Sequence, residues 1–256
     1  MEGQAKQAAR ALSVLLLAGL WAGCNCGDDV SGKKPTGCRA RGDCVLIEPG
    51  IVGAYTSAAV SADGTVWVAG YLEGNWRDDY SFGDLVVGKL EDGLVAWEVV
   101  DGAPTDEEVD CNVYDCEGFR KGVTGSGDDV GLWTSIQVEG GNPAVAYYDA
   151  SNKALKYASY AGGAWSAVTV QGRDGDDIGR YAKLRFIGGK PTIAYLYRER
   201  GESGAIVSGV RIATGSGAAA SSDGWSFEEV ASNPDSACNG TLCPAGYFCA
   251  LDTRRC

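Results

Sequence analysis

The sequence contains no histidine among its 256 residues. This absence excludes the Ser-His-Asp and Cys-His arrangements of nucleophilic catalysis, and it excludes zinc sites that use imidazole ligands. An enzyme made from this chain would therefore have to use carboxylates, tyrosine, lysine or arginine.

Basic residues are also scarce. Lysine and arginine together number 22 against 34 aspartates and glutamates, so the net charge is −12. Nucleic-acid binding needs a basic face that neutralises phosphates, and attraction to anionic lipid needs basic residues near the headgroups. We therefore expect no nucleic-acid partner, and we interpret the acidity as a means of keeping an exported protein soluble.

Glycine and aromatic residues, by contrast, are plentiful. The chain has 38 glycines against 7 prolines, and it has 7 tryptophans and 12 tyrosines. Abundant glycine is typical of short strands joined by tight turns. The aromatic content lets the chain bury enough apolar surface to offset the entropy of ordering, which excludes disorder over most of its length.

An apolar run lies near the start of the chain. Lys6 and Arg10 precede it, and it extends over the 12 residues 11–22. This run is too short to span a bilayer as a helix, which takes about 20 residues. Basic residues followed by a short apolar run and small residues are typical of an export signal. The sequence therefore predicts a signal peptide over residues 1–23.

The end of this run, Ala22-Gly23-Cys24, resembles a bacterial lipoprotein signal. The resemblance implies that Cys24 is the acylated first residue of the mature protein and that the lipid alone attaches it to a membrane. One position departs from the pattern, because Trp21 stands where the family has leucine or a similar residue. Polar residues over 24–43 then predict a flexible tether. The expected location is the outer membrane, or otherwise the periplasm or the exterior.

Ten cysteines in an exported chain predict disulfides. None of the close pairs has the Cys-x-x-Cys spacing of a zinc or redox site, so we expect no bound metal. Two local bridges are predicted from spacing, Cys38–Cys44 and Cys111–Cys116.

The remaining cysteines leave alternatives open. Lipidation of Cys24 leaves nine cysteines, with Cys26 as the one expected to stay unpaired; otherwise Cys24 is itself paired and there is no lipid. The tail contributes four more, which allow three pairings. These four are Cys238, Cys243, Cys249 and Cys256.

The body of the chain repeats. Residues 131–152 align with residues 179–200 at a constant offset of 48, and residues 53–74 form a weaker copy. Each copy continues with apolar stretches separated by polar or glycine turns, which gives four short strands per copy. Such a unit is one blade of a β-propeller, and blades must stack because none buries its faces alone. We therefore predict an all-β fold of three four-stranded antiparallel blades over residues 44–230.

Three aromatic residues, Tyr55, Trp133 and Tyr181, take equivalent positions near the start of each predicted innermost strand. Two insertions interrupt the repeat: residues 101–129 have the composition of a surface excursion, and residues 213–224 form a Gly/Ala/Ser loop inside the third blade.

The ends of the repeat region raise the question of closure. The apolar run 44–48 is interpreted as an outermost strand contributed by the N-terminal segment. Propellers typically have four to eight blades. Three blades therefore imply a fragment of a larger propeller, a ring closed by a partner such as a second copy, or an open wedge.

Residues 144–170, AVAYYDASNKALKYASYAGGAWSAVTV, resemble the repeats of secreted bacterial β-propeller proteins, which combine Ala-Tyr-Tyr-Asp, Leu-Lys-Tyr and Gly-x-Trp-Ser stretches. This resemblance implies a fold and not an activity. The tail over 231–256 contains ACNGTLCPAGYFCALDTRRC, which resembles small Cys-rich modules of bacterial surface proteins. We interpret it as a stapled C-terminal cap.

Aromatic residues that recur in the repeat have two interpretations. Packing between blades is the commoner role. The alternative is a sugar-binding cleft, as in lectin-type propellers, in which an aromatic face is combined with carboxylate or amide groups. The candidate ligand-binding residues are Trp133, Tyr148, Asp149, Trp165 and Trp225.

Two Ser/Asp/Gly turns, at residues 61–67 and 222–225, are similar to the Asp-box of sialidase-like propellers. That motif is a structural turn, and hairpin chemistry explains it here. A sialidase would also need an arginine triad, and nothing in the spacing of Arg180, Arg198 and Arg211 singles these residues out.

The acids of residues 173–177 resemble an oxygen-rich calcium loop but lack the remaining ligand positions of an EF-hand, so a solvated loop is favoured. We expect no catalytic residues and no cofactor. The predicted function is a non-enzymatic cell-envelope or surface module that binds a glycan or a protein. The alternatives are a carboxylate-based, sialidase-like carbohydrate-active enzyme and a structural component of the envelope.

Overall fold

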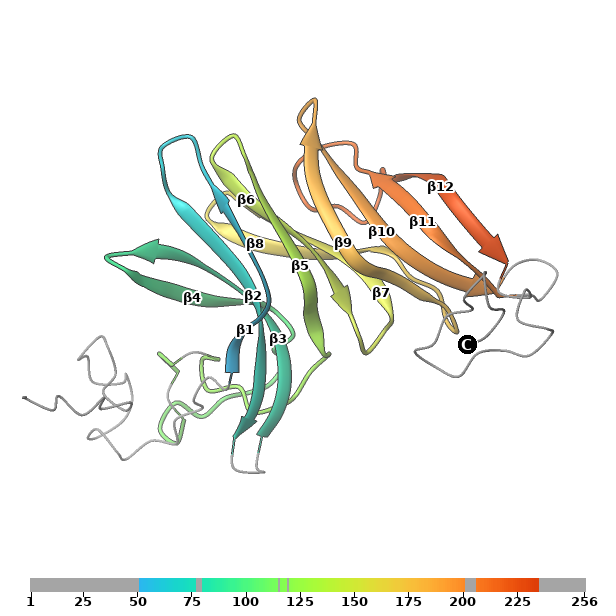
Figure 1. The fold of residues 1–256 in the computed structure, drawn as a ribbon. Helices are drawn as coiled ribbons and strands as arrows, with labels where there is room; N and C mark the ends of the chain where they lie inside the picture. Colours follow the sequence, from blue (N-terminus) through green and yellow to red (C-terminus); the bar gives the residue numbers. More distant parts are fainter. Residues whose placement is uncertain (1–50, 77–79, 115, 119, 201–205, 235–256) are drawn as a thin grey trace, which may run out of the picture. The chain divides into compact units, whose positions relative to one another are not determined.

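The computed structural model describes residues 51–76, 80–114, 116–118, 120–200 and 206–234, all of which belong to one compact unit. These residues form twelve strands and no helix (Figure 1). The strands make three separate four-stranded antiparallel sheets, and the sheets do not close into a ring. The predicted fold class, an all-β fold of three four-stranded antiparallel propeller-type blades, is confirmed.

Each blade is a simple meander in which consecutive strands are hydrogen-bonded neighbours. Blade 1 contains β1 (Ile51–Val60), β2 (Val66–Trp76), β3 (Tyr80–Glu91) and β4 (Leu94–Asp101). Blade 2 contains β5 (Val130–Glu139), β6 (Asn142–Asp149), β7 (Ala154–Ala161) and β8 (Ala164–Gln171). Blade 3 contains β9 (Asp177–Ile187), β10 (Lys190–Arg200), β11 (Ile206–Thr214) and β12 (Ser226–Pro234).

Several predictions concern residues that lie outside the described part of the chain. These are the signal peptide (1–23), the lipidated Cys24 and tether (24–43), the extra strand at 44–48, the Cys38–Cys44 bridge and the Cys-rich tail from residue 235 onward.

Paired glycines set the register of the first hairpin in blades 2 and 3. Gly140 and Gly141 both have positive φ, 58° and 84°, and Gly188 and Gly189 have 58° and 74°. Two consecutive left-handed residues form the type I′ turn, whose twist matches that of the flanking strands. The turns therefore place the apolar residues of β5–β6 and of β9–β10 on matching faces.

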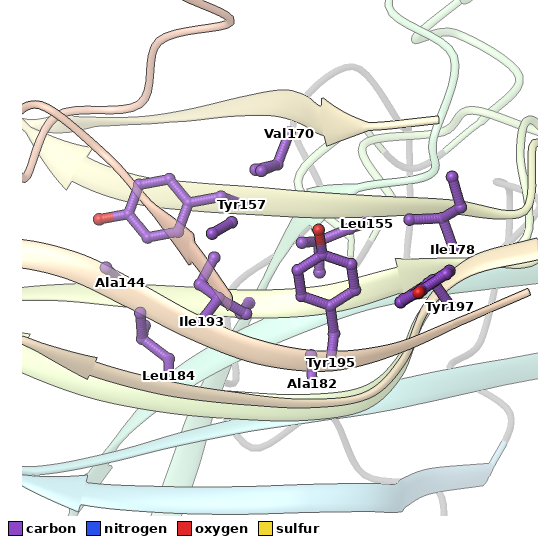
Figure 2. Close-up of a cluster of buried hydrophobic side chains, with 12 residues drawn as sticks. Ala144, Leu155, Tyr157, Val170, Ile178, Ala182, Leu184, Ile193, Tyr195 and Tyr197 are labelled. Atoms are coloured by element: carbon purple, nitrogen blue, oxygen red, sulfur yellow. The ribbon is translucent and has the colours of Figure 1, made fainter. Parts of the chain in front are cut away.

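Two apolar cores lie between the blades. One joins blades 1 and 2 and includes Leu85, Ile136 and Tyr147. The other joins blades 2 and 3, and Figure 2 shows Tyr157 and Leu155 of blade 2 facing Ile193 and Tyr195 of blade 3. Strands of blade 2 are covered on both faces, which explains their nearly continuous apolar sequence.

Buried tyrosines repeat one hydrogen bond across the two blade junctions. The Tyr147 hydroxyl donates to Asp101 at the end of β4 over 2.6 Å, and the Tyr195 hydroxyl donates to Gln171 at the end of β8 over 2.5 Å. Burial, together with the carboxylate of Asp101, raises the pKa of Tyr147 well above its usual value. Each bond satisfies a buried hydroxyl that would otherwise destabilise the core.

Serine side chains make a second repeated bond between the innermost strands of the blades, which are β1, β5 and β9. The Ile136 amide donates to Ser57 Oγ over 3.0 Å, and the Leu184 amide donates to Ser135 Oγ over 2.9 Å. Ser57 and Ser135 hold the same register position, and in blade 3 this position is Lys183. The first two blades thus each present a serine to the next blade, and the third does not.

The excursion between β4 and β5, residues 102–129, is anchored in blade 1 by a buried ion pair. Arg120 Nε lies 2.7 Å from Asp84 Oδ2, and both side chains have 0% exposure. The same guanidinium lies 4.1 Å from the Phe82 ring centroid. Burial raises the pKa of Asp84 to about 6, although the charge of Arg120 opposes this shift.

The composition of the excursion predicted a surface segment, but the structure shows that part of it is core. The reason is one basic residue, Arg120, whose charge is satisfied by Asp84 and by carbonyls of the excursion itself. The predicted Cys111–Cys116 disulfide is present, with an S–S distance of 2.02 Å. It closes a small loop within the excursion.

Candidate functional site

Each innermost strand carries the same irregularity. A glycine with φ of 102–120° is followed two residues later by an aromatic residue with φ of 51–58°. The three pairs are Gly53 and Tyr55, Gly131 and Trp133, and Gly179 and Tyr181. The pairing register shifts at each of these places, so each is a β-bulge.

Two of these glycines, Gly131 and Gly179, are required by close backbone contacts. A Cβ at Gly131 would lie 2.9 Å from the Leu85 Cα of blade 1, and a Cβ at Gly179 would lie 2.6 Å from the Leu155 Cα of blade 2. The innermost strands of blades 2 and 3 therefore each pass directly against the third strand of the blade before.

The aromatic residues have no such requirement for a left-handed conformation. A bulky residue at positive φ is unusual, because it costs about 1–2 kcal/mol in backbone strain. Three aromatic residues held in this conformation at equivalent positions therefore point to a role for their side chains.

Their rings form a row across the three blades. The centroid of Trp133 lies 5.5 Å from that of Tyr55 and 4.7 Å from that of Tyr181. Tyr71 extends the row beyond Tyr55 at 6.0 Å, and Tyr148 lies beside Trp133 at 5.2 Å. Tyr55 and Tyr181 are 43% and 50% exposed. The aromatic row, defined by these five residues, is thus partly open to solvent.

Charged groups flank the aromatic row at blade 3. The Arg180 guanidinium lies 5.6 Å from the Trp133 ring centroid and 5.5 Å from that of Tyr148. Asp177 pairs with Arg180 at 2.7 Å and accepts a hydrogen bond from the Tyr148 hydroxyl at 2.8 Å. Burial and this bond to Asp177 raise the pKa of Tyr148. Tyr148 therefore remains a neutral hydroxyl at physiological pH.

A cavity of about 310 Å³ lies at the blade 1 end of the row. It is bounded by the extended β2–β3 hairpin, by the end of the excursion and by the turn after β6. Tyr71 belongs to both the row and the cavity wall, and its hydroxyl donates to Asp129 Oδ1 at 2.8 Å. The row and the cavity therefore form one continuous candidate surface.

The structure brings together only two of the candidate ligand-binding residues, Trp133 and Tyr148. Asp149, which follows Tyr148, is buried and accepts bonds from the backbone and side chain of Asn152. These bonds hold the turn after β6, so Asp149 faces the turn and not the aromatic row.

The other two candidate residues lie in the blade junctions. Trp165 on β8 packs against the core between blades 1 and 2, with its ring 5.6 Å from Tyr160. Trp225 packs against the core between blades 2 and 3, 5.5 Å from the ring of Tyr157, and its indole N–H donates to the Ser221 carbonyl. Their surroundings are those of inter-blade core.

The Asp-box-like turn is held by its own side chains. Asp63 accepts hydrogen bonds from the Ser61 hydroxyl and from the Thr65 amide. These bonds lower the pKa of Asp63 to about 2. The aspartate therefore acts as the hairpin brace that the sequence indicates.

The acids of residues 173–177 are engaged by protein donors. Asp176 pairs with Arg173 at 2.5 Å and accepts from the Arg200 amide, and Asp177 is held by Arg180 as described. In the part of the chain that the structure describes, no group of three or more potential ligands is arranged for a metal ion.

The arginines considered for a sialidase triad all lie in blade 3. Arg211 pairs with Glu199 at 2.8 Å and stacks 4.0 Å from the Tyr197 ring centroid, while Arg180 pairs with Asp177. Both charges are therefore engaged by carboxylates of their own blade.

Sequence reasoning placed Tyr55 and Tyr181 in equivalent positions but did not count them, or Tyr71 and Arg180, among the ligand-binding candidates. The usable signal was the glycine two residues before each aromatic, which recurs in all three copies. A glycine and an aromatic at this spacing in every repeat is more than core packing requires.

No protein-family model matches the chain, and no curated protein is similar to it. One solved structure with some likeness is a protein of unknown function from Dyadobacter fermentans, at 10% identity and a TM-score of 0.37. The match covers 65% of this chain and 42% of that structure. Among the described residues, no helix is long and apolar enough to cross a membrane.

Proposed function

We propose that this chain is a non-enzymatic binding module of an exported surface protein and that the aromatic row holds a saccharide. The observation that carries the proposal is the left-handed backbone shared by Tyr55, Trp133 and Tyr181. Strain of this kind persists at positions that serve a ligand, because the surrounding structure must hold the residue there.

A row of aromatic faces suits a sugar polymer. Pyranose rings present apolar C–H faces, and aromatic side chains supply a large apolar surface with polar edges. Hydroxyl and carboxylate groups beside the rings fix orientation. Here the paired and partly exposed side chains of Asp177 and Arg180 provide polar groups next to Trp133, the central ring of the row.

Export and anchoring belong to the same proposal. The signal peptide over residues 1–23 and acylation of Cys24 would place the blades outside the cytoplasm, on a tether of residues 24–43, where envelope or environmental glycans are present. The intact mass of the native protein tests this part. A mature form that begins at Cys24 with added acyl mass supports it, and any other start contradicts it.

A glycan array tests the binding function. The purified module should retain a limited set of glycans, and the Tyr55→Ala/Tyr181→Ala double variant should lose them. Tyr160→Ala serves as the control, because the ring of Tyr160 belongs to a separate aromatic cluster, with Trp67 and Trp165. Absence of glycan binding, or equal binding by both variants, would contradict the proposal. Release of reducing sugar during incubation would favour the carbohydrate-active enzyme instead.

A further inference from the structure

The cavity at the blade 1 end of the aromatic row has a definite chemical character. Two carboxylates, Glu73 and Asp129, contribute to its wall together with the aromatic rings of Tyr71 and Phe82 and the hydroxyls of Ser126 and Ser151. No basic residue is among the described residues that line it. The cavity therefore presents negative charge and π faces to whatever enters.

Arg120, which lies behind the cavity wall, does not neutralise this charge. Arg120 stacks on Phe82, but it is fully buried and paired with Asp84. Its charge is thus balanced within blade 1. The chain as a whole has a net charge of −12, which adds to the negative potential at the cavity.

Asp129 is fixed in place before any ligand arrives. Its Oδ1 accepts from the Tyr71 hydroxyl, and its amide donates to Ser151 Oγ over 2.8 Å. A Cβ at Gly83 would lie 2.2 Å from Asp129 Oδ1, so the absence of a side chain at Gly83 leaves room for the carboxylate. A group held this way loses little entropy on binding.

Glu73 also lines the cavity, and its charge acts on Tyr71. Burial raises the pKa of Tyr71 first, and the charges of Asp129 and Glu73 raise it further. The Tyr71 hydroxyl is therefore neutral at all physiological pH values, and it lies within the electrostatic influence of both carboxylates.

We infer that this cavity is a subsite for an amino sugar, whose ammonium group it binds between Glu73 and Asp129 while Tyr71 contacts the ring. This inference rests on the proposed function, because the remaining sugar residues would extend along the aromatic row. An ammonium forms strong charge-assisted bonds with carboxylates and is attracted to aromatic faces. A volume near 310 Å³ lies at the lower end for ligand pockets and suits one sugar ring.

Calorimetric titration with three β-1,4-linked tetramers tests the inference: glucosamine, N-acetylglucosamine and glucose. The titration is done at about pH 5.5, where the amine of glucosamine is protonated. The glucosamine tetramer should bind about tenfold more tightly than the two neutral tetramers. Glu73→Gln and Asp129→Asn should each reduce this preference, and added salt should weaken it because the attraction is electrostatic.

Glu91→Gln is the control, because Glu91 is an exposed carboxylate at the end of β3, eight residues from Gly83, and does not line the cavity. Equal affinity for all three tetramers, or an unchanged preference in Glu73→Gln, would overturn the inference while leaving the proposed function intact. Failure of all three tetramers to bind would overturn the inference, and the glycan array then decides the proposed function separately. Tighter binding of a tetralysine peptide than of the glucosamine tetramer would assign the cavity to a cationic peptide and overturn the sugar assignment.

Discussion

The rings of Trp133 and Tyr181, which lie 48 residues apart in the sequence, are in contact at 4.7 Å between centroids. Both residues have a left-handed backbone, with φ of 51° and 58°. The contact joins the innermost strands of blades 2 and 3. It shows that the repeat produces a continuous aromatic surface and not three separate aromatic residues.

The left-handed backbone at Tyr181 predicts that glycine is more stable than alanine there, the reverse of the order in an ordinary strand. Tyr181→Gly should be about 1 kcal/mol more stable than Tyr181→Ala, because glycine adopts positive φ without steric cost. Urea unfolding of both variants gives the comparison. At Tyr160, which lies in strand β7 and is not among the residues with positive φ, the order should reverse, since glycine weakens an ordinary strand. Alanine more stable than glycine at both positions would contradict the assigned backbone.

The repeated serine bond predicts that loss of the serine hydroxyl destabilises both blade junctions by similar amounts. Ser57→Ala and Ser135→Ala each leave a strand amide, that of Ile136 or of Leu184, without its acceptor. An unsatisfied buried amide costs about 1–3 kcal/mol of the free energy of unfolding. Ser222→Ala, in an exposed loop of blade 3, should change stability by less than about 0.5 kcal/mol. Losses no larger than that of the control would show that these bonds do not join the blades.

The buried pair of Arg120 and Asp84 predicts that substitutions of these two residues have strongly non-additive effects on the free energy of unfolding. Arg120→Met or Asp84→Asn alone leaves a polar partner buried, and each should reduce the free energy of unfolding by about 3–5 kcal/mol. The Asp84→Asn/Arg120→Met double variant should lose much less than the sum of the two. A double-mutant cycle in urea measures this difference, and simple additivity would contradict the proposed anchoring of the excursion.

The repeat made the fold predictable from the sequence. The constant offset of 48 between residues 131–152 and 179–200 predicted blades 2 and 3 and the equivalence of Trp133 and Tyr181, and the weaker copy over 53–74 added Tyr55. Blade 1 was recognisable despite its weaker match, because its four apolar stretches follow the same order. The disulfide between Cys111 and Cys116 followed from spacing alone.

The candidate site was less predictable, because its features depend on tertiary contacts. The positive φ of Tyr55 follows from a bulge whose register the partner strand sets. Arg120 lies in a polar excursion, where the sequence gives no sign of burial. Only the fold brings it to Asp84, 36 residues away. For Trp165 and Trp225 the sequence allowed either a sugar-binding cleft or the commoner role of packing between blades, and the structure places both against the cores.

Blade 3 differs from blades 1 and 2 at the position of the serine bond. Lys183 replaces the serine with which blades 1 and 2 each contact the following blade. A fourth blade of the same kind would find no matching acceptor at this position.

The affinity of the module for its best array glycan, with and without the Tyr181 ring, tests the central claim most directly. Calorimetry should show binding at least about tenfold weaker in Tyr181→Ala than in the wild type, since one stacked aromatic contributes about 1.5 kcal/mol. Tyr160→Ala should bind as the wild type does. Wild-type affinity in Tyr181→Ala would contradict the account, because the aromatic row would then not be the surface that holds the ligand.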